Sequence, residues 1–149
     1  MIEIYTDGSC IKNNYGGYGV VIYKDGKLID CYAKREENTT NNICELKAIL
    51  YALVKYGLYN PTPTVYSDSA YAINSLTVWR HTWKDKGWNR YDGGTIKNLE
   101  LIQAFDELEE KGFKINLIKV KGHDNVEGNI LADKLATGKI LPKDILNKK

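Results

Sequence analysis

The sequence has few cysteines, no long apolar run and little net charge, and each shortage excludes a class of protein. Its three cysteines, Cys10, Cys31 and Cys44, are odd in number and form no C-x-x-C pair. This argues against a disulfide framework and against a structural zinc site. No stretch approaches the roughly 18 apolar residues of a membrane helix, and the N-terminus is unlike a signal peptide. We therefore expect a soluble, cytoplasmic protein with reduced thiols and no membrane partner.

Size and composition fit one domain spanning residues 1–149, with 43% hydrophobic and 27% charged residues. A chain of this length buries about 68–70% of the surface that its unfolded form exposes, so it needs no metal merely to fold. Any metal would serve chemistry. No internal repeat is visible. We expect the lysine-rich segment 139–149 to be a basic tail that is free to move.

The hydrophobic pattern predicts an α/β fold with the element order βββαβααβα. Two stretches rich in Val, Ile and Tyr flank the dipeptide Asp25-Gly26, which favours a type I′ hairpin turn, so the first three strands form an antiparallel meander. Amphipathic helices follow at 41–57, from Ser69 toward Trp79, at 95–112 and at 129–138. With strands at 64–69 and 113–120, the pattern predicts a mixed five-stranded sheet flanked by helices.

Four acids stand where such a fold gathers its functional groups. Asp7 and Asp68 end two predicted strands, Glu45 lies in the first turn of a helix, and Asp133 interrupts a largely apolar helix. A helix cap or a solvated surface position explains any single acid of this kind more simply than a site does. Four acids in one cleft would repel one another, and the usual compensation is a hard divalent cation such as Mg²⁺ or Mn²⁺. A paired metal site of this kind favours phosphoryl transfer.

The motifs TDGSC, GGYG, TTNNICELKA, SDS-Y and KGHDNVEGNILAD occur together and in order, and in this combination the chain resembles type 1 ribonuclease H. The match covers nearly the whole chain. The resemblance implies a ribonuclease H-like fold and an enzyme that cuts the RNA strand of RNA–DNA hybrids. The Met start just before the first motif and the basic tail lead us to expect a free-standing protein, and we expect a monomer. It also implies two Mg²⁺ ions, or Mn²⁺, held by Asp7, Glu45, Asp68 and Asp133, and products with 5′-phosphate and 3′-hydroxyl ends.

His123 lies in a glycine-flanked loop, where a lone histidine is more often a surface residue than a catalytic one. The resemblance gives it a role in proton transfer or product release. It also implies contacts with the hybrid, made through small or amide side chains and through a basic aromatic segment. The small and amide residues are Gly8, Ser9, Cys10, Asn13, Thr40, Asn41, Asn42, Asn74, Asn98 and Asn129.

The basic aromatic segment, residues 79–90, carries Trp79, Trp83, Trp88, Lys84 and Lys86 and suits a phosphate backbone. Burial in the core is an equally good explanation for Trp79, whose position fits a helical apolar face. A helix cap is likewise an alternative for Asn42, which stands in capping-box register with Glu45.

Two positions depart from the resemblance. Ala70 replaces an amide after the SDS motif, and Ile130 replaces a glutamate after Asn129. We expect Ala70 to weaken a contact with the substrate, for which Asn74 would substitute. We expect Ile130 to alter only the residues that support the site from behind. Other readings of the chain are a hybrid-binding module without activity, an integrase or exonuclease on the same fold, and a domain of a reverse transcriptase.

Overall fold

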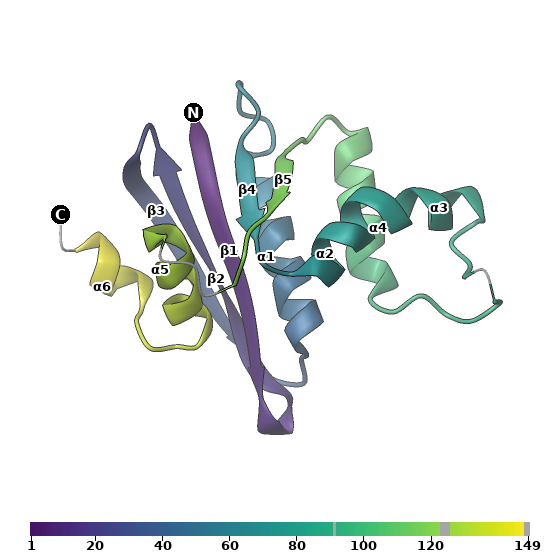
Figure 1. Cartoon of the computed structure of the whole chain (residues 1–149), viewed down its shortest axis with the longest axis horizontal. Coiled ribbons are helices and arrows are strands. Elements are labelled where there is room, and N and C mark those ends of the chain that lie inside the picture. Colours follow the sequence, from purple (N-terminus) through teal and green to yellow (C-terminus); the bar gives the residue numbers. More distant parts are fainter. Residues whose placement is uncertain (91, 123–125, 148–149) are drawn as a thin grey trace.

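Five strands form one mixed sheet in the computed structural model, which describes residues 1–90, 92–122 and 126–147 (Figure 1). The strand order is β3-β2-β1-β4-β5; β1 to β3 are antiparallel, while β4 runs parallel to β1 and β5 parallel to β4. The strands are β1 (Ile2–Ile11), β2 (Tyr15–Lys24), β3 (Lys27–Glu36), β4 (Thr64–Ser67) and β5 (Asn116–Lys119). The predicted sheet is confirmed, although β5 is shorter than the stretch 113–120.

The turns between the first three strands follow from residues that tolerate a positive φ. Asp25 and Gly26 have φ angles of 50° and 82°, as the type I′ turn at this dipeptide requires. Asn13 and Asn14 take φ angles of 70° and 57° in the short turn η1 (Lys12–Asn14) between β1 and β2. These two tight turns let three ten-residue strands pair along their full length.

The predicted helices are present with some shifts at their ends, and a short helix at 142–146 is additional. The segment expected from Ser69 toward Trp79 continues to Asp85 as three consecutive pieces, the middle one a π-helical turn. Within the described residues, no helix combines the length and the apolar character that crossing a lipid bilayer requires. The helical elements are α1 (Asn41–Tyr56), α2 (Ala70–Asn74), η2 (Ser75–Trp79), α3 (Arg80–Asp85), α4 (Leu99–Glu110), α5 (Glu127–Ala136) and α6 (Pro142–Leu146).

Helix α1 begins two residues earlier than a cap at Asn42 would require. Thr40 is the N-cap: its backbone is extended, and its hydroxyl accepts a hydrogen bond of 3.1 Å from the backbone N–H of Ile43. The capping role considered for Asn42 is therefore wrong, and its side chain is exposed in the first turn.

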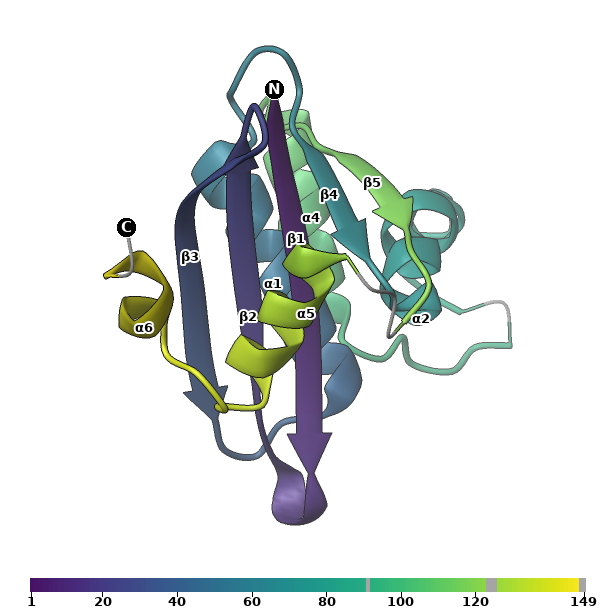
Figure 2. The same ribbon diagram turned by 60° about the vertical axis from the view of Figure 1, so that its left-hand side comes forward.

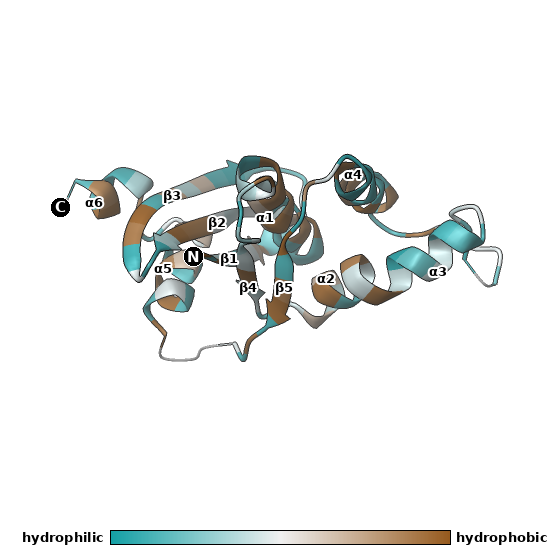
Figure 3. Cartoon of the chain, turned by 90° about the horizontal axis from the view of Figure 1, so that it is seen from above, coloured by the Kyte–Doolittle hydropathy of each residue, from teal (hydrophilic) through white to brown (hydrophobic). Residues whose placement is uncertain are grey.

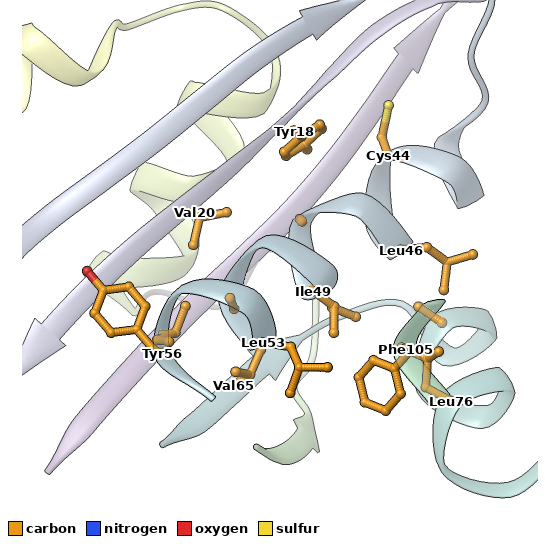
Figure 4. Packing of buried hydrophobic residues seen from close by; sticks show 14 of the residues in the cluster. Tyr18, Val20, Cys44, Leu46, Ile49, Leu53, Tyr56, Val65, Leu76 and Phe105 are labelled. Carbon is orange, nitrogen blue, oxygen red and sulfur yellow. The ribbon is translucent and has the colours of Figure 1, made fainter. Parts of the chain in front are cut away.

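The main hydrophobic core fills the space between one face of the sheet and the helices α1, α2 and α4 (Figures 2 and 3). Figure 4 shows α1 contributing Leu46, Ile49 and Leu53 to it, with Val65 from β4 and Phe105 from α4. Each fully buried Leu or Ile side chain stabilises the fold by roughly 1.5–3 kcal/mol. This core fixes the N-terminal turn of α1 against the middle of β1.

A second, smaller core lies on the opposite face of the sheet, under α5 and α6. Val21, Tyr23 and Cys31 meet Leu135 of α5 there, and Ile145 and other side chains of α6 pack at its edge. Residues 142–146, part of the segment expected to be a mobile tail, form a short helix in this structure. The lysines of the segment indicate solvated charge, but Ile145 and Leu146 pack against the core that contains Cys31 of β3.

Candidate active site

Asp7 and Asp68 lie side by side because their strands are parallel neighbours. Tyr5 of β1 pairs with Tyr66 of β4, so the residues two positions further along, Asp7 and Asp68, are level at the same point of the sheet. The backbone N–H of Gly8 donates a 2.9 Å hydrogen bond to Oδ1 of Asp7 and orients that carboxylate.

Glu45 reaches the two aspartates because Gly8 has no side chain. A Cβ atom at this position would lie 2.5 Å from the backbone nitrogen of Glu45 and 2.7 Å from the carbonyl carbon of Cys44. No real Cβ tolerates such distances, so the bare backbone of β1 is what lets the first turn of α1 approach.

One carboxylate oxygen from each of Asp7, Glu45 and Asp68 lies within 4.8 Å of the other two. Glu45 is only 7% exposed, and its buried Oε1 has no hydrogen-bond partner among the described residues. A buried, unpartnered carboxylate oxygen beside two further carboxylates is unfavourable alone and is well suited to coordinate a cation. The three residues therefore fit a hard divalent ion with oxygen ligands.

Asp133 approaches the same point from the other face of the sheet. Gly19, which pairs with Asp7, leaves no room for a side chain, since a Cβ there would lie 2.6 Å from the carbonyl oxygen of Ala132. Helix α5 thus rests directly on β2. Gly128 allows a similar approach to the ring of Tyr5 on β1. Asp133 lies outside the group of three acids whose oxygens are within 4.8 Å, but it shares two hollows with Asp7 and Asp68.

The electrostatics reflect this crowding of acids. Burial, together with the nearby charges of Asp68 and Asp133, raises the pKa of Asp7 to about 7. Burial, together with the charges of Asp7 and Asp68, raises the pKa of Glu45 far above its ordinary value. Without a cation, the site therefore retains protons near neutral pH.

The carboxylates separate two hollows in the surface. The first hollow opens toward α5 and the segment before it, and the second opens toward the first turn of α1. Besides Thr6 and the shared acids, the first is lined by Lys121, Gly122, Asn129, Ile130, Lys134 and Lys139. Besides the shared acids, the second is lined by Gly8, Ser9, Cys10, Asn41, Asn42, Glu45 and Ser69.

Five of the predicted contact residues line the second hollow: Gly8, Ser9, Cys10, Asn41 and Asn42. Asn129 lines the first hollow, and its buried Nδ2 has no hydrogen-bond partner among the described residues. Ile130, expected behind the site, instead forms part of the wall of that hollow and is 40% exposed.

Other predicted contact residues lie outside both hollows. Asn13 is exposed in η1 and Asn74 is exposed at the end of α2. The hydroxyl of Thr40 caps α1. Asn98 has a left-handed backbone, and its Nδ2 donates to the hydroxyl of Tyr71. Ala70 is exposed at the start of α2.

His123, the predicted proton-transfer residue, is outside the described residues. Its neighbour Gly122 is described, and a Cβ atom at Gly122 would lie 3.2 Å from Oδ2 of Asp68. The chain entering the histidine loop therefore passes directly beside one of the clustered carboxylates.

The tryptophans of the basic aromatic segment divide between surface and core. Trp79 is 41% exposed, so the alternative of full core burial is wrong for it. Trp83 and Trp88 are partly buried and pack against the main core. The segment lies at the end of the molecule opposite to α6 (Figure 1).

Two basic residues of this segment are paired with acids of α4. Arg80 is buried, with hydrogen bonds of 2.6 Å to Asp106 and to Glu109, and its Nε donates to the carbonyl of Leu76 in the π-helical turn. Lys84 makes ion pairs with Asp106 and Glu110. Burial alone would raise the pKa of Asp106, but its hydrogen bonds to Lys84 and Arg80 lower it. Much of the segment's positive charge is thus already neutralised by α4.

Three residues that the sequence motifs did not single out line the first hollow: Lys121, Lys134 and Lys139. Two signals were available, since Lys121 is part of the KGH motif and Lys134 directly follows Asp133. Lys139 had been assigned to the tail.

The fold and the carboxylate cleft define an α/β protein that gathers acids at neighbouring strands, and comparisons with known proteins identify its family. The family model described as RNase H matches residues 1–140. The chain is 42% identical over 142 residues to ribonuclease H of Acetivibrio thermocellus, covering 93% of this chain and 94% of that protein. The chain therefore belongs to the ribonuclease H family, which confirms the predicted fold and the expectation of an enzyme.

Solved structures agree with this assignment. The crystal structure of LC9-RNase H1, described as a type 1 RNase H with the type 2 active-site motif, is 30% identical with a TM-score of 0.75, covering 91% of this chain and 69% of that one. The foamy viral protease-reverse transcriptase in complex with RNA/DNA hybrid shares the fold at 20% identity and a TM-score of 0.81. That match covers 91% of this chain and 19% of the viral one.

Proposed function

We propose that this protein is an endonuclease that hydrolyses the RNA strand of RNA–DNA hybrids and leaves 5′-phosphate and 3′-hydroxyl ends. The observation that carries the proposal is the cluster of Asp7, Glu45 and Asp68, whose oxygens lie within 4.8 Å of one another at the boundary of two surface hollows. Its family membership and the hybrid bound to a relative of the same fold support the choice of substrate.

Asp7, Glu45, Asp68 and Asp133 would hold two Mg²⁺ ions, with Mn²⁺ as a substitute. When bound, a pair of such ions supplies a nucleophilic water at neutral pH and stabilises negative charge on the scissile phosphate and the leaving oxygen. The donor set consists of oxygen atoms only, which suits both metals. Asp7, which borders both hollows and lies within 4.8 Å of Glu45 and Asp68, would provide ligand oxygens to the metal, as its motif position implies.

The chain's own residues bind and orient the substrate. The second hollow presents backbone and small side chains at Gly8, Ser9 and Cys10, with the amides of Asn41 and Asn42 opposite. Such groups suit the shallow minor groove of a hybrid, where the 2′-hydroxyl both donates and accepts hydrogen bonds. Asn129, which lines the first hollow, is proposed to contact the substrate from that side.

His123 is proposed to transfer a proton or to assist product release, as its motif position implies. For the DNA strand, we assign the contact to the basic aromatic segment, where the ring of Trp79 is 41% exposed. Lys84 would exchange its ion pairs with Asp106 and Glu110 for a phosphate.

An inactive hybrid-binding module is the second candidate, because a fold alone does not fix activity. It would have no need of the unpartnered Oε1 of Glu45 between two further carboxylates, which makes a metal-dependent enzyme the better explanation.

One experiment tests the proposal directly. Labelled hybrid, duplex RNA and duplex DNA are incubated with the protein in Mg²⁺, Mn²⁺ or EDTA, and the products are analysed for chain length and end groups. We expect cutting of the hybrid's RNA strand only, and only with metal. Asp7→Asn should abolish cleavage and keep hybrid binding, whereas Glu107→Gln, a change of an exposed acid on α4, should leave cleavage unchanged. Cutting of duplex DNA, or near wild-type turnover by Asp7→Asn, would contradict the proposal.

A further inference from the structure

Three lysines line the first hollow, beside the carboxylates. Lys121 precedes the histidine loop, Lys134 follows Asp133 on α5, and Lys139 follows the end of that helix. All three line the same hollow as Asp7, Asp68 and Asp133. We name Lys121, Lys134 and Lys139 the lysine rim.

The backbone holds each lysine of the rim in place. Val120, just before Lys121, donates a 2.9 Å hydrogen bond to the carbonyl of Ser67 at the end of β4. At the end of α5, Gly138 takes a φ of 79°, and the N–H of Lys139 then donates to the carbonyl of Lys134 at 2.9 Å. This is the hydrogen-bond pattern of a glycine-terminated helix, and it brings the two lysines together.

The rim differs from the basic aromatic segment in its available charge. None of its three lysines forms an ion pair or a side-chain hydrogen bond with another residue that the structure describes. In the basic aromatic segment, Arg80 and Lys84 are paired with acids of α4, and Arg90 is paired with Asp92. The three lysines of the rim are therefore available to neutralise phosphates directly beside the carboxylates.

We propose that the lysine rim binds phosphates of the RNA strand on either side of the cleaved bond and so is a second electrostatic anchor for the hybrid. This inference rests on the proposed function, because the strand that is cut must bring its phosphate to the carboxylates. That strand therefore passes through the hollow that the lysines line. In Figure 1, α5 and α3 lie on opposite sides of β4, so a duplex across the site contacts the rim with one strand and the basic aromatic segment with the other.

The test compares two triple variants of equal charge. One is Lys121→Gln with Lys134→Gln and Lys139→Gln. The control is Lys27→Gln with Lys55→Gln and Lys114→Gln, three exposed lysines at the end of the sheet opposite the site. Hybrid cleavage at saturating Mg²⁺ and hybrid binding in EDTA are measured between 50 and 300 mM salt.

We expect the rim variant to raise KM at least about tenfold at 0.1 M salt. The slope of log affinity against log salt should flatten by about 1 for each lysine removed, and the control variant should keep the wild-type slope. Lysines that serve only to offset the charge of the acids would change the Mg²⁺ concentration needed for activity, and would leave KM at saturating Mg²⁺ and binding in EDTA unchanged. Equal slopes for the two variants overturn the inference.

The strand is assigned with neutral methylphosphonate linkages placed beside the cleavage point. In the RNA strand they should weaken binding by the wild type and have little further effect on the rim variant. If only linkages in the DNA strand behave in this way, the assignment to the RNA strand is overturned. If the wild type binds the hybrid but does not cut it, the proposed function fails. The salt dependence of hybrid binding would then still test whether the lysine rim contacts phosphates.

Discussion

Glu45 is the residue whose environment is hardest to explain without a bound cation. Its carboxylate is buried, one oxygen lacks a partner among the described residues, and two aspartates lie beside it. Its pKa is raised above the ordinary 4.5 mainly by burial, and then by the charges of Asp7 and Asp68. Cation binding must therefore release protons, and metal affinity is expected to increase with pH.

At the residue scale, Glu45→Gln should stabilise the metal-free protein. In the unfolded chain Glu45 ionises near pH 4.5, whereas in the folded protein it keeps its proton to a higher pH, so the wild type loses stability as pH rises above about 4.5. The amide removes this loss. We expect a gain on the order of 2 kcal/mol at pH 7 in EDTA and almost none at pH 4.

Urea unfolding at the two pH values in EDTA measures this difference, with the exposed Glu107→Gln as the control. In saturating Mg²⁺ the order should reverse, because ligand binding stabilises the wild type and the variant has lost a ligand. A gain of equal size at pH 4 and pH 7 would show that burial of charge is not the cause.

The sequence identifies the acids of the site, but it does not show which basic residues are paired with acids. Asp7, Glu45 and Asp68 stand at positions that motifs and strand ends mark, and the structure brings them together. The partner of Arg80 is Asp106, which is 26 positions away on another helix. No local pattern around Arg80 or Lys84 indicates that such partners exist.

At the scale of elements, glycines set the distances between helices and sheet. Gly8 brings α1 onto β1 and Gly19 brings α5 onto β2, so the two helices deliver Glu45 and Asp133 from opposite faces of the sheet. The sequence predicted these helices from their hydrophobic period. The hydrophobic period does not show how closely each helix approaches the sheet, because this distance depends on which residue of the strand lies beneath the helix.

Gly8→Ala should therefore damage both stability and catalysis. The added methyl group would overlap the backbone of Cys44 and Glu45 and push α1 away from β1. We expect a loss of about 1–3 kcal/mol in the free energy of unfolding. Hybrid cleavage should fall by about 100-fold, because a displacement of about 1 Å at a catalytic group has effects of this size.

The matched control is Gly94→Ala in the loop before α4, where the nearest atom belongs to the exposed side chain of Asp92. It should change stability by less than about 0.5 kcal/mol and leave cleavage unaltered. Denaturant unfolding and steady-state kinetics report both quantities. Normal turnover by a destabilised Gly8→Ala would restrict the glycine's role to packing.

At the scale of the whole molecule, the sheet separates two cores of unequal size. The larger one supports β1, β4 and the first turn of α1, where three of the four acids lie. The smaller one supports α5 and is completed by α6. The sequence predicted the larger core through its long amphipathic helices, but α6 spans five residues, too few for a hydrophobic period to be recognised.

The double change Ile145→Ala with Leu146→Ala tests what α6 contributes. Both side chains are partly buried against the smaller core, and the carbonyl of Pro142 at the start of the helix accepts a hydrogen bond from the thiol of Cys31. We expect a loss of about 2 kcal/mol and a fall in Tm of about 4–8 °C. Cleavage at 20 °C should stay within about threefold of the wild type, because Asp7, Glu45 and Asp68 lie in the region fixed by the larger core, and the contact at Gly19 still seats α5 and its Asp133 on β2. Lys143→Ala, an exposed position on the same helix, is the control and should leave Tm unchanged.

Thermal unfolding and hybrid cleavage, measured on the same samples, show whether α6 contributes to stability alone. An unchanged Tm for the double variant would show that α6 contributes nothing to stability, as expected of a tail. A loss of cleavage without a loss of stability would place α6 in contact with the substrate.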